Sequence, residues 1–194
     1  MTWWLSVRRT LVVYGCVLVS LVALGFTGSA VVPVPSFVNG LSLPLAVSNI
    51  LPLILVTALM LGLGSRSLAL EGNATRGLVA YDLAWVYVAV LAAIAGSAIV
   101  AAMGAPGTAA YVRNLLGFVG VALIVARFLG FESSALIPSG LIIVSSMFGR
   151  QLNGEVSAWA WPVAQPSESA PWAIAGTLML LGSVALITSR PRTT

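Results

Sequence analysis

The sequence lacks histidine and lysine, has one cysteine, Cys16, and is only 7% charged. Without histidine or lysine the chain cannot form a Ser–His or Ser–Lys nucleophile pair, a Schiff base, a histidine-held haem or a Walker A phosphate site. A single cysteine allows neither a disulfide within the chain nor a thiolate metal cage. We therefore expect a non-catalytic chain with no cofactor and no bound metal.

Acidic residues are also few and dispersed: Glu71, Asp82, Glu132, Glu155 and Glu168. Proton chemistry or the binding of a hard cation needs several oxygen ligands close together. Asp82 and Glu132 each fall near an arginine at the predicted end of a span. We expect both to be solvated or paired with arginine at the surface rather than to relay protons.

Hydrophobic residues make up 59% of the 194 residues, and the mean hydropathy is +1.05. So little polar surface cannot cover a water-soluble particle, so lipid must surround most of the chain. Windows of about 20 apolar residues predict six transmembrane helices. They cover residues 11–32, 43–64, 83–103, 109–130, 134–149 and 172–188. The predicted fold is an all-α polytopic membrane protein, with residues 1–194 forming a single transmembrane domain.

Three of the predicted spans carry irregular features. The first follows Arg8 and Arg9 and has the pattern of a leader peptide, but we expect it to be retained as a membrane anchor. The fourth holds Arg113 and Arg127 near its two ends, where long arginine stems can reach the membrane surface. The fifth is short and contains Pro138, so it is the least regular span.

The arginines predict an orientation. If the N-terminus is cytoplasmic, seven of the nine arginines lie on the cytoplasmic side, and only Arg113 and Arg150 lie outside. This bias follows the positive-inside rule and places both termini in the cytoplasm. We expect a multi-pass membrane protein. Its interface aromatics would be Trp3, Trp4, Tyr81, Trp85, Trp159, Trp161 and Trp172.

Two connections are long enough to contact something other than lipid. The cytoplasmic connection, residues 65–81, mixes Leu68 and Leu70 with Glu71 and Arg76, so it is either a docking element for a partner or an interfacial loop. The outside connection, residues 150–171, contains Trp159, Trp161 and Pro162 and is either an element dipping into the outer leaflet or an aromatic-belt loop. Arg113 and Asn114 could border this outside element.

Small residues recur along the third span: Ala89, Ala93, Gly96, Ser97 and Ala101. Such a stripe lets another helix approach closely. Gly117 and Gly120 in the fourth span offer a shorter version. We expect helix packing at these positions, not a ligand site.

The order of these features resembles the membrane-spanning subunits of bacterial ATP-binding-cassette exporters of the six-helix, type-2 permease class. The shared order is an arginine-bearing N-terminal approach, six spans, a polar cytoplasmic connection after the second span and a long outside re-entrant element before the sixth. The run S-L-A-L-E-G-N-A-T-R-G-L, residues 67–78, is also similar to small permease subunits of actinobacterial peptide-antibiotic exporters.

The resemblance implies a permease subunit that exports a hydrophobic or peptide-like substrate. A separate nucleotide-binding ATPase subunit would dock on residues 68–76, and a second permease subunit, identical or different, would complete the pathway. Two alternatives stay open. A small secondary transporter or channel would use broken helices at residues 49–52 and 138–140. A structural or assembly subunit of a larger membrane complex would use the small-residue stripe for packing.

Overall fold

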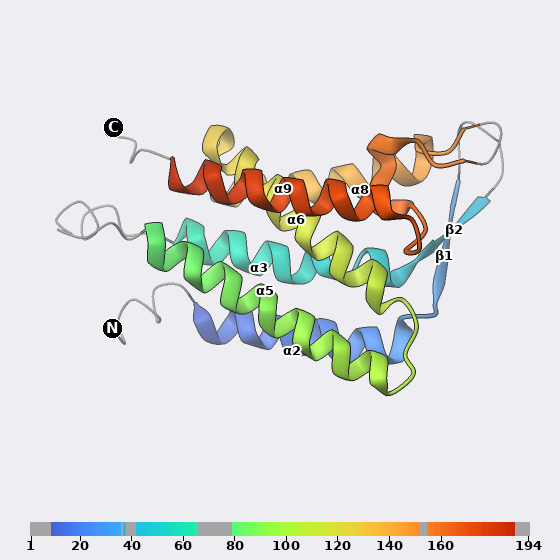
Figure 1. Ribbon diagram of the computed structural model, residues 1–194, viewed down its shortest axis with the longest axis horizontal. Coiled ribbons are helices and arrows are strands. Elements are labelled where there is room, and N and C mark those ends of the chain that lie inside the picture. Colours follow the sequence, from blue (N-terminus) through green and yellow to red (C-terminus); the bar gives the residue numbers. More distant parts are fainter. Residues whose placement is uncertain (1–8, 36, 38–41, 66–78, 152–154, 189–194) are drawn as a thin grey trace, which may run out of the picture.

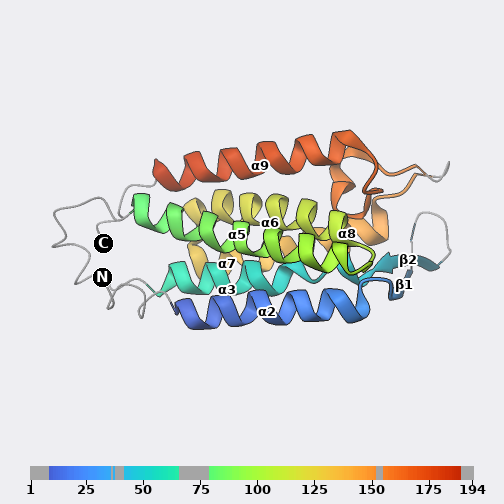
Figure 2. The same ribbon diagram turned by 60° about the horizontal axis from the view of Figure 1, so that its bottom comes forward.

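The computed structural model describes residues 9–35, 37, 42–65, 79–151 and 155–188, and this part of the chain forms a helical bundle (Figures 1 and 2). The long helices are α2 (Thr10–Thr27), α3 (Pro52–Gly64), α5 (Val79–Ala102), α6 (Thr108–Leu129), α8 (Leu136–Phe148) and α9 (Ser169–Ile187). Counting the short helices that precede α3 and α8, six helical segments are long and apolar enough to span a membrane. The chain is an all-α, multi-pass membrane protein, as predicted.

Helix α6 is the centre of the bundle. Two thirds of its most apolar window is buried inside the protein (67%), against 22% for α2. Its close packing against α9 depends on Gly120, where a Cβ atom would lie 2.3 Å from the backbone carbon of Leu178. Gly182 of α9 faces the Gly120 backbone in return. This pair lets the two helix backbones touch, as small residues do in membrane bundles.

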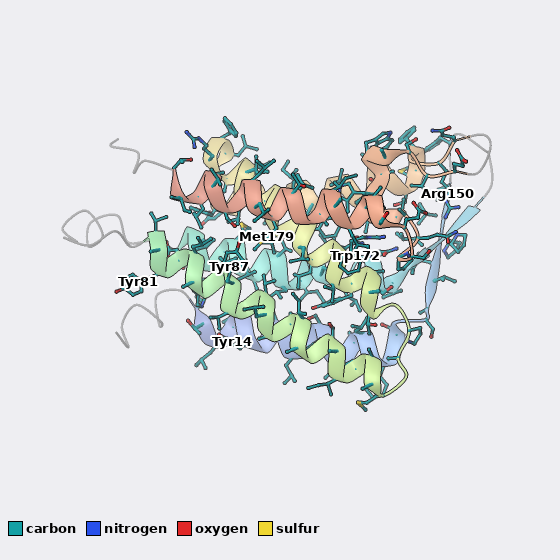
Figure 3. The ribbon with its side chains drawn as sticks, in the orientation of Figure 1. Tyr14, Tyr81, Tyr87, Arg150, Trp172 and Met179 are labelled. Atoms are coloured by element: carbon teal, nitrogen blue, oxygen red, sulfur yellow. The ribbon has the colours of Figure 1, made fainter. Side chains whose placement is uncertain are left out.

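Two hydrogen bonds between side chains join further helices. The Tyr111 hydroxyl of α6 bonds with Ser20 of α2 at 2.9 Å, and the Tyr87 hydroxyl of α5 bonds with Ser183 of α9 at 2.9 Å. Tyr87 and Met179 are labelled in Figure 3 on neighbouring helices. Interhelical bonds of this kind add to packing where the hydrophobic effect between helices is absent.

The ends of the first two spans differ from the prediction. The first helix ends at Thr27 rather than near residue 32, and the second span begins at Val47 rather than at residue 43. The residues between them form strands β1 (Val31–Pro35) and β2 (Ser42–Ala46), which pair antiparallel. Composition alone could not separate this apolar hairpin from the helices beside it.

Prolines explain why these residues form strands and how they pair. Pro33 lies directly opposite Pro44, and Pro35 lies opposite Ser42. The Val47 amide donates to the Ala30 carbonyl at 2.9 Å, so this neighbouring pair occupies a hydrogen-bonded position. Because hydrogen-bonded and non-bonded pairs alternate, all three prolines fall where no N–H is needed between the strands.

The candidate break at residues 49–52 falls where the 3-10 helix η1 (Val47–Asn49) meets α3, and the candidate break at residues 138–140 lies within α8 without interrupting it. Asn49 ends η1, and Pro52 is the first residue of α3. The fifth span consists of α7 (Phe131–Ser134) and α8, joined at Ala135, and Pro138 is the third residue of α8. A proline in a first turn sacrifices no intrahelical hydrogen bond.

The small-residue stripe of α5 divides along its length. Ala89, Ala93 and Ser97 are buried, and Gly96 lies against Leu21 of α2, whose side chain leaves no room for a Cβ atom. Ala101 is exposed. The stripe therefore packs within the bundle over most of its length, and its last member lies outside that packing.

Candidate functional site

A buried arginine forms the centre of a polar cluster at the hairpin end of the bundle. Arg113 lies in the second turn of α6, and its side chain is 0% exposed. The guanidinium donates to the backbone carbonyls of Pro162 at 3.0 Å, Ala164 at 2.9 Å and Gln165 at 3.2 Å. Its Nε–H donates to the Asn114 side-chain oxygen at 3.1 Å. A charge can be buried only when its hydrogen-bonding capacity is met in this way.

Asn114 joins the same cluster to the start of the second span. Its amide nitrogen donates to the Pro162 carbonyl at 2.9 Å, and to the Asn49 side-chain oxygen and carbonyl at 3.2 Å and 3.3 Å. Asn49 belongs to η1, which follows the hairpin directly. Arg113 and Asn114, adjacent in α6, therefore hydrogen-bond to the segment that precedes α9, and Asn114 also bonds to Asn49, just after the hairpin.

That second element is the 3-10 helix η2 (Ala158–Val163), and its aromatic side chains point in different directions. Trp161 is buried, and its ring lies over Gly117, where a Cβ atom would come within 2.1 Å of the indole. The Trp161 and Phe118 rings are 5.5 Å apart. Trp159 is exposed. Gly117 thus provides the space that lets η2 dock on α6.

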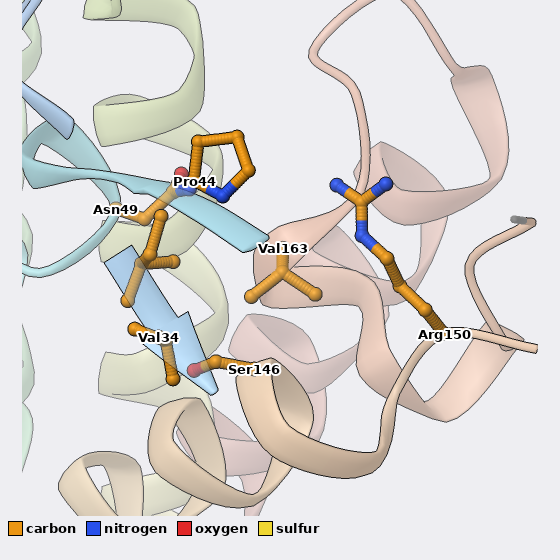
Figure 4. A pocket seen from close by; sticks show the side chains of 7 residues that line it. Val34, Pro44, Asn49, Ser146, Arg150 and Val163 are labelled. Carbon is orange, nitrogen blue, oxygen red and sulfur yellow. The ribbon is translucent and has the colours of Figure 1, made fainter. Parts of the chain in front are cut away.

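A small pocket adjoins this cluster (Figure 4). It is lined by hairpin residues together with Asn49, Ser146, Arg150 and Val163. Its volume is about 20 Å³, enough for a water molecule. Ligand pockets usually measure about 300–1,000 Å³, so this pocket cannot hold a transported substrate.

Three predictions about single residues at this end and in α5 are wrong. Arg113 does not extend to the membrane surface, because backbone carbonyls within the protein accept its hydrogen bonds. Trp85 and Trp161 are not interface aromatics, since both are buried in the core, whereas Tyr81 and Trp159 are exposed. Trp172 is partly buried and donates to the Pro166 carbonyl at 3.0 Å. Figure 3 places Trp172 and Arg150 at the hairpin end and Tyr81 at the opposite end.

At the opposite end, the acidic residues also differ from each other. Asp82 lies in the first turn of α5 and is 1% exposed, so the expectation of a solvated surface position is wrong, and its pairing with an arginine stays a prediction. Glu132 is exposed, as predicted, and lies against Gly64 at the end of α3. The predicted docking residues Leu68, Leu70, Glu71 and Arg76 lie outside the described residues.

The sequence did not predict the hydrogen bond between Asn114 and Asn49, or the packing of the Trp161 ring against Gly117. The sequence predicts that Arg113 and Asn114 border the W-A-W-P element, residues 159–162, and the structure joins both side chains to the Pro162 carbonyl. Within the part of the chain that the structure describes, no group of acidic, cysteine or histidine residues could hold a metal ion.

No family model, curated protein or solved structure matches the chain. The fold and the site therefore define its class directly: a multi-pass, all-helical membrane protein in which η2 is fixed to the central helix.

Proposed function

We propose that this chain is the membrane-spanning permease subunit of an ATP-binding-cassette transporter of a bacterial plasma membrane. It exports a hydrophobic or peptide-like substrate, using ATP hydrolysed by a separate subunit. The observation that carries the proposal is the pairing of six spans with a structured element, η2, placed immediately before the last span and fixed by Arg113. This order of elements is the one on which the resemblance to type-2 permeases rests.

The arrangement of the helix ends supports the position of the ATPase. Helix α3 ends and α5 begins at the same end of the bundle at which α2 begins and α9 ends (Figures 1 and 2). Residues 66–78 connect α3 to α5, so this connection starts and finishes at that end. The arginines of the sequence assign the same end to the cytoplasm. A cytoplasmic ATPase would therefore meet the connection that carries Glu71 and Arg76.

The division of labour follows from composition. A chain without lysine has no Walker A lysine to bind the ATP phosphates, so nucleotide chemistry must come from another subunit. The pocket beside Asn49 is too small for a substrate. The pathway would form between two permease subunits, identical or different, lined mainly by apolar side chains.

Site-specific crosslinking tests this proposal. Glu71→Cys and Arg76→Cys, each in a Cys16→Ser background, are treated in native membranes with a bifunctional thiol–amine reagent. We expect a crosslinked product that contains a nucleotide-binding subunit. Trp159→Cys, exposed at the opposite end, is the matched control and should give no such product. Labelling of Glu71→Cys and Arg76→Cys without any ATPase adduct, in membranes that express the whole complex, would contradict the proposal.

A structural subunit of a larger membrane complex is the second candidate. The observation that favours it is that Arg113, Asn114 and Asn49 use their hydrogen bonds to hold this chain's own segments together. Deleting the chain separates the two functions. A permease deletion abolishes export while the ATPase remains at normal abundance, whereas loss of a structural subunit leaves export by the remaining complex.

A further inference from the structure

The β1–β2 hairpin exposes apolar side chains at the end of the bundle. Val31 is 58% exposed, Val32 44% and Phe37, in the turn region, 66%. The sequence has no charged residue between Thr10 and Ser65, so the hairpin itself carries none of the charges that usually solvate a hairpin in water, and Arg150 is a charged neighbour in the pocket beside it. An uncharged apolar surface of this kind calls for a partner other than bulk water.

The hairpin is attached to an exposed apolar face of α8. The Phe37 amide donates to the Met147 carbonyl at 3.2 Å, and the rings of Phe37 and Phe148 stack at 5.5 Å with 18° between their planes. Phe148 is itself 48% exposed and follows the exposed Ile143 and Val144 along α8. The hairpin surface therefore continues the exposed apolar face of a membrane-spanning helix.

The register of the hairpin argues against a protein strand as the partner. Residues at non-hydrogen-bonded positions direct their N–H groups to the free edge, and in β1 these residues are Val31, Pro33 and Pro35. Two of the three are prolines and have no N–H. An added strand would find only one donor along the β1 edge, and Pro44 removes one of the three donors from the β2 edge, so β-strand addition is disfavoured at both edges.

The same edge limits how deeply the hairpin can lie. The described sheet has two strands, so no further strand donates hydrogen bonds to the carbonyls on its two outer edges. Placing a carbonyl without a hydrogen-bond donor in hydrocarbon costs several kcal/mol. The apolar side chains disfavour water, and the backbone edges disfavour hydrocarbon. The headgroup and glycerol layer of a bilayer satisfies both, because it offers water and apolar contact at the same depth.

We infer that the β1–β2 hairpin lies in the phospholipid headgroup layer at its end of the bundle, with Val31, Val32 and Phe37 in contact with lipid. The charges near the hairpin nearly balance, with Arg113 and Arg150 against Glu155 and Glu168. The contact therefore needs no anionic lipid, and phosphatidylcholine is sufficient. This inference does not depend on whether the chain is a permease.

Depth-dependent quenching tests the inference. Single cysteines in a Cys16→Ser background are labelled with an environment-sensitive fluorophore, and the protein is reconstituted in phosphatidylcholine vesicles. Phe37→Cys and Val31→Cys report the hairpin, so the result does not depend on the Phe37–Phe148 stack alone. Leu18→Cys, 64% exposed in the middle of α2, calibrates the hydrocarbon, and Glu155→Cys, exposed at the hairpin end, calibrates water.

We expect both hairpin positions to be quenched about twofold more by a doxyl group near the lipid headgroup than by one deep in the acyl chain. Leu18→Cys should show the reverse order, and Glu155→Cys should respond mainly to aqueous iodide. Replacing part of the phosphatidylcholine with phosphatidylglycerol should change nothing. Quenching of the hairpin by iodide alone, by the deep doxyl group, or by neither would each overturn the inference, the last because protein would then cover the hairpin.

Discussion

The two arginines of α6 have the same chemistry and opposite environments. Arg113, near the start of the helix, is fully buried and donates to the carbonyls of the segment around η2. Arg127, in the last turn, is exposed and donates to the Thr188 hydroxyl at the end of α9. Both arginines lie near an end of the same span, so a hydropathy profile cannot tell which of them is buried.

The difference comes from what surrounds each side chain. Around Arg113, the proline-containing 3-10 helix η2 and the two residues after it present backbone carbonyl oxygens, and one guanidinium can bond several of them at once. Arg127 is exposed in the last turn of α6, where a positive charge interacts favourably with the C-terminal end of the helix dipole. Arg113 therefore organises the fold, whereas Arg127 contributes charge to one end of it.

The largest expected effect comes from removing the two arginines in parallel. Arg113→Met removes one hydrogen bond from each of the Pro162, Ala164 and Gln165 carbonyls and should lower the free energy of unfolding by about 2–4 kcal/mol. Arg127→Met, the matched control, should change it by less than about 0.5 kcal/mol, because exposed polar contacts contribute little. Denaturant titration of the detergent-solubilised protein measures both. Equal losses in the two variants would remove the contrast on which the account rests.

A second pair of variants extends the comparison to glycines. Gly120→Ala should cost about 1–3 kcal/mol, because its Cβ atom would overlap the backbone of α9 at Leu178 and Met179. Gly140→Ala on α8 meets nothing within 4 Å and should leave stability unchanged or slightly higher. Thermal unfolding in the same detergent separates them. A stable Gly120→Ala variant would mean that α6 and α9 are further apart than described.

The smallest expected effect concerns the link between Asn114 and Asn49. A double-mutant cycle with Asn114→Ala and Asn49→Ala should give a coupling energy of about 0.5–1 kcal/mol, as expected for one interhelical hydrogen bond. Pairing Asn114→Ala with Thr188→Ala, at the end of α9 and bonded to Arg127 at the far end of α6, should give none. Coupling of the same size in both cycles would show that the variants act through the whole bundle and not through the described hydrogen bond.

Composition and window hydropathy predict the six spans well, because long apolar runs have few alternatives to a membrane helix. They fail at residues 31–35 and 42–46, where apolar strands have the same hydropathy as the helices beside them. Pro33, Pro35 and Pro44 carried the missing signal, since prolines at alternating positions disfavour a helix and permit a hairpin.

The polar cluster was only partly predictable. The predicted topology places Arg113 and Asn114 near the W-A-W-P element, because the start of the fourth span and the connection before the sixth span are both on the outside. The burial of Arg113 did not, since it depends on Gly117 admitting the Trp161 ring and thereby bringing the Pro162 carbonyl to α6. Contacts between residues about 50 positions apart cannot be read from a local pattern.

The most direct test of the account is hydrogen exchange at the arginine side chains. In nitrogen-15-labelled protein in lipid nanodiscs, we expect an arginine Nε–H resonance that exchanges slowly with water and disappears in Arg113→Lys. The Arg127 resonance, assigned with Arg127→Lys, should exchange rapidly. If the Arg113 Nε–H exchanges as fast as that of Arg127, the buried cluster does not exist in the membrane-embedded protein.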